Sequence, residues 1–445
     1  MENMINRTYN MPKADIKPFF PAASVVVNNG FLHTISGLGN NKAVTAFIAV
    51  ICFLMTANIN AQTLEWVKVV GGNGFIKGNS IAIDDDGNFY VTGVFLNTND
   101  WEKPGSLFTL DGGKIFVQKL DAKGKFLWTK FFGGNKCDKG NSIAIDEGGN
   151  IYTTGYFNDI VDFSPGVYSM KLASAGENDV FIQKLDKNGN FLWAKSFGGK
   201  LHDKGTSIAV DEIGNIFTTG TFQDTIDFKP GKNFTHLSSA GESDIFIMKL
   251  DANGNFLWAK SFGGKMSDNA IDLAIDGAGN VYSTGTFMGF VDFDPGKDSM
   301  KMSAVGIRYI YIQKLDTHGN LQWVKTIVGK GCDNVNSIVV DGVGNVYTTG
   351  YFNEGFIIPE TGAILVSSTD PDTFIQKFDA QGNLLCFNTF GGNDYEDYAN
   401  SIAIDNKDNV FTIGYFSGTV DFDQKKDGIK LTAGGGSDLF VLKLK

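Results

Sequence analysis

The sequence predicts an all-β protein, a six-bladed β-propeller made of four-stranded antiparallel blades. Three observations predict this fold: one segment recurs six times, each copy carries two hairpin turns, and the two ends of the chain complement each other. With 55 Gly, 38 Phe and 9 Pro in 445 residues, the composition also suits many short strands joined by tight turns.

An aspartate after a Ser-Ile-Ala-Ile segment, or a close variant of it, marks each copy, and successive copies are 62, 65, 65, 65 and 64 residues apart. These aspartates are Asp84, Asp146, Asp211, Asp276, Asp341 and Asp405. Each opens a turn of the Asp-x-x-Gly-Asn type, with Asp408 at the glycine position of the last copy, between two apolar segments, which is a hairpin signal. A second turn of this chemistry, Asp186-Lys-Asn-Gly189-Asn190 in one copy, follows Asp179-Val-Phe-Ile. Each copy therefore supplies four strands, A to D, as a propeller blade requires.

The two ends of the chain supply parts of one blade. The last copy stops after its strand C, residues 439–444, while residues 64–70 near the N-terminus repeat the pattern of strand D. Trp66 and Lys68 match Trp193 and Lys195 of a complete copy. We expect the strand 64–70 to complete the last blade and close the ring, which hides strand edges. The alternative is a ring of seven blades.

The N-terminal segment predicts export. Residues 1–61 read as an N-terminal extension with a signal peptide, whose apolar run 43–59 lies between Lys42 and Ala61. Residues 62–445 then form a single propeller domain of six repeats. We expect a secreted, periplasmic or outer-surface protein with no membrane span once the signal is cleaved. The alternative is an N-terminal membrane anchor.

Charge and histidine content limit the function classes. The net charge is −11 and Arg308 is the only arginine after residue 61, which argues against nucleic-acid binding. Only three histidines follow residue 61, and no Ser-His-Asp set or histidine cluster stands out, so a binding protein is expected rather than an enzyme. No cofactor is expected, although a divalent cation such as calcium is compatible with the acidic residues. The mature chain is expected to be a monomer.

Several recurring motifs resemble one known repeat. Ser142-Ile-Ala-Ile-Asp146, Gly149-Asn150, Val161-Asp162-Phe163 and Asp179-Val-Phe-Ile recur with small changes through residues 64–445. This pattern is similar to the bacterial SBBP family, whose name denotes a seven-bladed β-propeller, whereas six copies are counted in this chain. The resemblance implies an extracellular scaffold or binding module whose ligand is not defined.

Candidate binding residues fall into two groups. Five aspartates stand at one position of the D–A connection, four residues before the Ser position of strand A: Asp138, Asp203, Asp268, Asp333 and Asp397. One interpretation is a ring at the channel mouth that holds a divalent cation or a basic ligand. The other is that each carboxylate accepts backbone N–H bonds within its own loop. The second group breaks the repeat: Trp101, His202, Arg308, His318 and Tyr395.

Residues present in nearly every copy are expected to build the blades. We expect the recurring tryptophans, such as Trp193, to pack between blades, and the recurring lysines, such as Lys184, to pair with a carboxylate of their own blade. Cys386 replaces the tryptophan of the fifth copy and is expected to be a small buried apolar residue.

The function expected from these features is that of a binding or interaction scaffold for a protein or glycan ligand. The B–C connections are longer than the other loops, so the face that carries them and the D–A connections is the preferred binding face. The alternatives are a hydrolase or lyase that acts on polysaccharide, and a structural component of the envelope.

Overall fold

The computed structural model describes residues 74–444 apart from 98–111, 166–168, 230–234, 295–298, 305–307, 330, 332, 354, 359–362, 366–370, 393–396, 406–407 and 424–427. These residues belong to one compact unit, Asn73–Lys445. Every regular element described is a strand, which confirms the all-β prediction. No segment in these ranges is a helix of the length and apolarity needed to cross a bilayer. The predicted signal peptide and the predicted closing strand, residues 64–70, lie outside the described residues, as do Trp101 and Tyr395.

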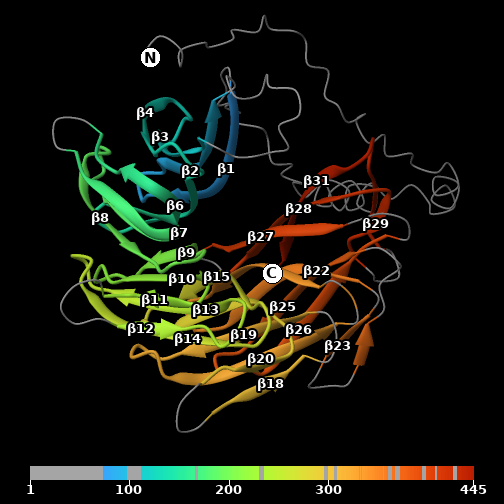
Figure 1. Ribbon diagram of the computed structural model, residues 1–445. Coiled ribbons are helices and arrows are strands. Elements are labelled where there is room, and N and C mark those ends of the chain that lie inside the picture. Colours follow the sequence, from blue (N-terminus) through green and yellow to red (C-terminus); the bar gives the residue numbers. More distant parts are fainter. Residues whose placement is uncertain are drawn as a thin grey trace, which may run out of the picture. The chain divides into compact units, whose positions relative to one another are not determined.

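Six antiparallel blades follow one another along the chain, as predicted, and their order is visible from β1 (blue) to β31 (red) in Figure 1. Blade 1 contains β1 (Gly74–Ile83), β2 (Phe89–Asn97), β3 (Lys114–Leu120) and β4 (Phe126–Phe132). Blade 2 contains β5 (Lys139–Ile145), β6 (Ile151–Asp162), β7 (Lys171–Leu185) and β8 (Phe191–Phe197). Blade 3 contains β9 (Lys204–Val210), β10 (Ile216–Phe222), β13 (Asp244–Leu250) and β14 (Phe256–Gly264).

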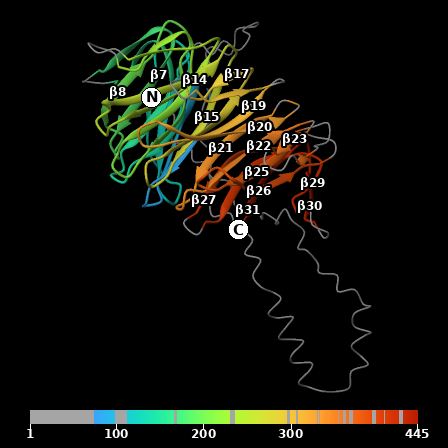
Figure 2. The ribbon, with the colours of Figure 1, turned by 90° about the horizontal axis from the view of Figure 1, so that it is seen from below.

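Blade 4 contains β15 (Asn269–Ile275), β16 (Val281–Phe287), β19 (Tyr309–Leu315) and β20 (Leu321–Gly329). Blade 5 contains β21 (Asn334–Val340), β22 (Val346–Phe352), β25 (Asp372–Phe378) and β26 (Leu384–Phe390). Blade 6 contains β27 (Tyr398–Ile404), β28 (Val410–Phe416) and β31 (Asp438–Leu444), and within the described ranges its sheet has these three strands. Figure 2 shows blade 5 between blades 4 and 6.

In blades 3 to 6 the long B–C connections are hairpins, and in blades 4 and 5 they pair with the preceding blade. They form β11 (Thr225–Asp227) with β12 (His236–Ser238), β17 (Phe290–Asp292) with β18 (Lys301–Ser303), β23 (Phe356–Ile358) with β24 (Ala363–Leu365), and β29 (Thr419–Asp421) with β30 (Lys430–Thr432). In blade 2 the hairpin is continuous with β6 and β7. β17 of blade 4 pairs with the end of β14 of blade 3, and β23 of blade 5 pairs with β20 of blade 4. The chain approaches so closely here that a Cβ atom on Gly264 would lie 1.9 Å from the carbonyl oxygen of Phe290.

Apolar side chains of neighbouring blades form the core. Each strand A contacts the strand A of the next blade, from β1 and β5 through to β21 and β27. Ile143 of β5, for example, belongs to the same buried cluster as Ile115 and Val117 of β3. A bulge in strand A adds a polar link, because the Asn79 and Asn141 side-chain amides each donate to a carbonyl of the following blade at 2.7 Å.

Two faces of the unit lack this cover. Ile81 of β1 is 60% exposed, whereas the corresponding residues of blades 2 to 6 are between 2% and 5% exposed. On blade 6, Val441 is 55% exposed, whereas the corresponding Ile182 of blade 2 is fully buried. These are the face of blade 1 turned away from blade 2 and the face of blade 6 turned away from blade 5. Both faces therefore carry, at exposed positions, the apolar side chains that are buried against a neighbouring blade in the other copies.

Candidate functional site

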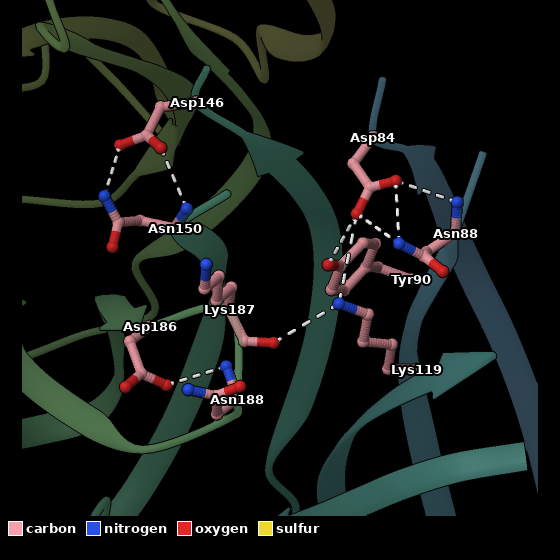
Figure 3. Close-up of polar contacts among 9 residues, drawn as sticks. All are labelled: Asp84, Asn88, Tyr90, Lys119, Asp146, Asn150, Asp186, Lys187 and Asn188. Carbon is pink, nitrogen blue, oxygen red and sulfur yellow. Dashed lines mark hydrogen bonds and ion pairs between the residues drawn. The ribbon is translucent and has the colours of Figure 1, made fainter. Parts of the chain in front are cut away.

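Two of the recurring lysines pair with a carboxylate of their own blade, as predicted: Lys119 with Asp84, and Lys184 with Asp146. Asp84 accepts hydrogen bonds from Asn88 and Tyr90, and the Lys119 ammonium lies 3.9 Å from its carboxylate and over the Tyr90 ring (Figure 3). Lys119 also donates to the carbonyl oxygen of Lys187 in the C–D turn of the next blade at 3.3 Å. The side chain therefore pairs with a carboxylate of its own blade and links that blade to the following one.

The recurring tryptophans pack between blades, which confirms the prediction. A Cβ atom on Gly189, in the C–D turn of blade 2, would lie 3.1 Å from the ring of Trp128 in blade 1. Trp323 makes the same contact with blade 5 and donates from Nε1 to the carbonyl oxygen of Ala380 at 3.1 Å. The prediction for Cys386 is wrong, because this side chain is exposed. The side chain at this position of blade 5 would cover the C–D turn of blade 6, but within the described residues no C–D turn follows β31.

The five D–A aspartates are buried and bound to backbone. Asp138 Oδ2 accepts the Gly134 N–H at 2.7 Å, and its Oδ1 accepts the Asn158 N–H at 3.1 Å. Asp203 and Asp268 repeat both contacts. Each carboxylate thus ties a D–A connection to the end of strand B in the following blade. This geometry is the one expected from the loop-anchoring interpretation.

The same aspartates do not converge. No three His, Cys, Asp or Glu side chains in the described ranges are grouped closely enough to hold a metal ion. Burial raises the pKa of Asp138 to about 6 and those of Asp203 and Asp268 to about 7, although backbone N–H groups oppose the shift. The five positions are therefore separate junctions between blades, and a ligand role for them stays a prediction.

A second buried carboxyl group stands beside two of these junctions, and our sequence reasoning missed its role. Asp179 in β7 and Asp244 in β13 are 2% and 3% exposed. Burial raises the pKa of each to about 6. Gly198 leaves room for Asp179, because a Cβ atom there would lie 2.1 Å from the carboxyl carbon. The available signal was the recurrence of Asp before Val-Phe-Ile or Ile-Phe-Ile.

Asp272 of β15 is another residue that the sequence analysis missed. The other five copies have serine here: Ser80, Ser142, Ser207, Ser337 and Ser401. The Asp272 carboxylate accepts the Ser207 hydroxyl of blade 3 at 2.7 Å and the Ser337 hydroxyl of blade 5 at 3.0 Å. It also accepts the Ile338 N–H of blade 5 at 3.0 Å. Because it reaches both neighbouring blades, Asp272 lies on the axial side of blade 4 and joins three blades.

The predicted symmetry breakers that are described do not form one group. His202 is exposed in the connection between blades 2 and 3, and His318 is exposed in the C–D turn of blade 4. These two segments are at opposite ends of the blades, so the histidines cannot share a catalytic site. Arg308 immediately precedes β19, at the same end of the blades as His202.

Exposed apolar side chains accompany Arg308 at this end of blade 4. We call the end that carries the D–A connections and the B–C hairpins the loop face. Phe287 pairs with Tyr309, so Met288 and Arg308 are opposed, at the place where blade 2 has the hydrogen-bonded pair Asn158 and Asn178.

Phe290 extends this group. It is 78% exposed, and Met266, whose sulfur would lie 3.3 Å from a Cβ atom on Gly289, is 42% exposed. We call Met266, Met288, Phe290 and Arg308 the fourth-blade patch.

Comparison with known proteins gives partial matches. The model of the SBBP family, described as a beta-propeller repeat, matches residues 127–158 and 322–356. An uncharacterised WD repeat-containing protein of Acanthamoeba polyphaga mimivirus is 24% identical over 72% of this chain and 27% of its own length. The regulatory protein FlaEY of Caulobacter vibrioides is 25% identical over 52% of this chain and 22% of its own length. This chain thus spans about a quarter of these relatives.

Among solved structures, a protein of unknown function from Dyadobacter fermentans aligns with a TM-score of 0.40 and 11% identity, over 82% of this chain and 93% of that one. The two family matches each begin in a strand D; the first ends within β6 of the next blade, and the second ends at Phe356, the first residue of β23. The same segments fold here as parts of blades 1, 2, 4 and 5. The chain is therefore a six-bladed β-propeller that carries SBBP repeats.

Proposed function

We propose that this protein is an exported binding scaffold that engages a protein or glycan ligand through its loop face, with the fourth-blade patch at the centre of the contact. Export is proposed from the apolar run 43–59 and the small residue Ala61. The binding role is proposed from the distribution of side chains on the blades.

The observation that carries the proposal is the contrast between repeated and unrepeated side chains. Repeated polar residues such as Asp84, Lys119 and Asp138 are occupied within and between blades. The fourth-blade patch instead presents an aromatic, two methionines and the only arginine after residue 61. Aromatic, Met and Arg side chains are enriched at protein interfaces, and most contact energy there comes from a few such residues.

Binding measurements on the chain 62–445 test this proposal. The immobilised protein is offered a glycan array and extracellular proteins of the source cells, and each ligand found is titrated against Phe290→Ser with Arg308→Gln. We expect at least a tenfold loss of affinity. Ile213→Ser is the matched control, since this exposed side chain lies in an A–B turn at the opposite end of the blades.

Equal affinity of both variants for every ligand would remove the fourth-blade patch from the proposal. Turnover of a polysaccharide by the purified chain would replace the scaffold by the hydrolase or lyase alternative. Absence of any ligand in both assays would favour a structural role in the envelope.

A further inference from the structure

Two pairs of buried carboxyl groups stand at the junctions that follow blades 2 and 3. The first pair is Asp179 with Asp203, and the second is Asp244 with Asp268. All four side chains are at most 3% exposed. The members of each pair border neighbouring glycines. A Cβ atom on Gly198 would lie 2.1 Å from the Asp179 carboxyl carbon, and the next residue, Gly199, donates its N–H to Asp203 at 2.7 Å. Gly263 and Gly264 border Asp244 and Asp268 in the same way. The first carboxylate of each pair also contributes to raising the pKa of the second. Two carboxyl groups therefore share a site from which water is largely excluded.

Hydrogen bonds only partly compensate for this burial. Asp179 accepts the Ala175 N–H at 2.9 Å, and Asp244 accepts the Ala240 N–H at 3.0 Å, each through Oδ2. The Oδ1 atoms of both residues are buried and have no hydrogen-bond partner within the described part of the chain. A buried carboxylate with an unpaired oxygen is costly, because the water it has lost is not replaced.

The junction after blade 1 shows how the chain balances the same position. Lys114 pairs with Phe95 in the register in which Asp179 pairs with Phe157, so it replaces the second carboxylate. A Cβ atom on Gly133 would lie 3.0 Å from Lys114 Cγ and 3.1 Å from Asp138 Oδ2, so both side chains border this glycine. The Lys114 charge acts to lower the pKa of Asp138. Here the chain itself supplies a positive charge beside the D–A aspartate.

We propose that a calcium ion occupies the place of that ammonium group at the next two junctions, bound by Asp179 and Asp203 after blade 2 and by Asp244 and Asp268 after blade 3. Carboxylate oxygens are the ligands that Ca²⁺ takes from proteins, and its flexible coordination accepts backbone carbonyls and water at the remaining positions. Two carboxylates neutralise one divalent cation, and the unpaired Oδ1 atoms gain a partner. Each ion would hold a D–A connection to strand C of the blade that this connection leaves, β7 in blade 2 and β13 in blade 3.

Calcium titration of the chain 62–445, freed of metal by EDTA, tests the proposal. Calorimetry with CaCl₂ should give one site fewer for Asp179→Asn and two fewer for Asp179→Asn with Asp244→Asn than for the unchanged protein. The melting temperature of the unchanged protein should rise by several degrees in millimolar calcium, because an ion that binds only the folded state stabilises it. Asp121→Asn, which alters an exposed C–D turn of blade 1, should leave the number of sites unchanged.

A second variant guards against misfolding of the first. Asp179→Lys copies blade 1, so it should fold without calcium at this junction and bind one ion fewer. The proposal is overturned if the unchanged protein binds no calcium at millimolar concentration. It is also overturned if folded Asp179→Lys keeps the full number of sites.

Discussion

Replacing Ile81 by aspartate tests whether blades 1 and 6 pack against each other in solution. Ile81 is 60% exposed. Four more apolar side chains of the two uncovered faces are between 40% and 68% exposed. These are Ile83, Ile413, Leu439 and Val441. If residues 64–70 complete blade 6 as the sequence predicts, the two faces meet and Ile81 becomes buried like its counterparts in the other blades.

The expected effect follows from the buried area. Full burial of an aliphatic side chain contributes about 1.5–3 kcal/mol, so covering the exposed part of five of them contributes about 5 kcal/mol to closure. An aspartate at position 81 would leave a charge in that interface and cost about 3 kcal/mol. On an open face the same substitution changes stability by less than about 0.5 kcal/mol.

Urea unfolding of the chain 62–445, followed by tryptophan fluorescence, measures the difference. Ile213→Asp is the matched control, because Ile213 is 80% exposed in an A–B turn and should be insensitive in either case. We expect Ile81→Asp to lower the unfolding midpoint clearly, and deletion of residues 62–72 to abolish that effect. The same midpoint for Ile81→Asp and Ile213→Asp would refute ring closure.

Two further predictions concern buried carboxylates. Asp272→Ala should lower the free energy of unfolding by about 3 kcal/mol, because Ser207, Ser337 and the Ile338 N–H lose their acceptor. The control is Ser142→Ala, which removes one hydrogen bond of 3.3 Å between blades. Equal losses of unfolding free energy for the two variants in urea would show that Asp272 does not join the blades. Burial raises the pKa of Asp138 to about 6 from 3.8, so the folded chain binds this proton more tightly than the unfolded chain does. Protonated Asp138 therefore adds about 3 kcal/mol to the free energy of unfolding. This contribution is complete below pH 3.8 and is lost as the pH rises through 6. Asp138→Asn should flatten that part of the pH profile in EDTA, and an unchanged slope between pH 4 and pH 7 would contradict the assignment.

Local patterns explain why the blades could be predicted. The turns that open at Asp146 and Asp186 have their hydrogen-bond partners within four residues, so the sequence displays them directly. Strand register follows from these turns, and six copies made the assignment consistent. The inter-blade role of the tryptophans was also predictable, because a large apolar residue that recurs in most blades is expected to be buried by a feature that the blades share.

The candidate site was less predictable, because its partners are distant in the sequence. Asp272 contacts residues 65 positions away in both directions, and nothing in its local sequence indicates that reach. The long B–C connections looked like free binding loops, yet the structure uses them to pair with the preceding blade. Cys386 illustrates the same limit, because its exposure depends on a turn of another blade.

The sequence by itself determined the fold class, the number of repeats and the positions of the turns, because these depend on side-chain alternation and on turn residues a few positions apart. Only the tertiary structure decided which polar groups meet. Contacts between blades join residues about one repeat apart, and in a repeated chain every copy offers the same candidates. The structure selected Asp179 beside Asp203 and Lys114 beside Asp138, and it placed Met266 against Gly289, the residue before Phe290, at the loop face.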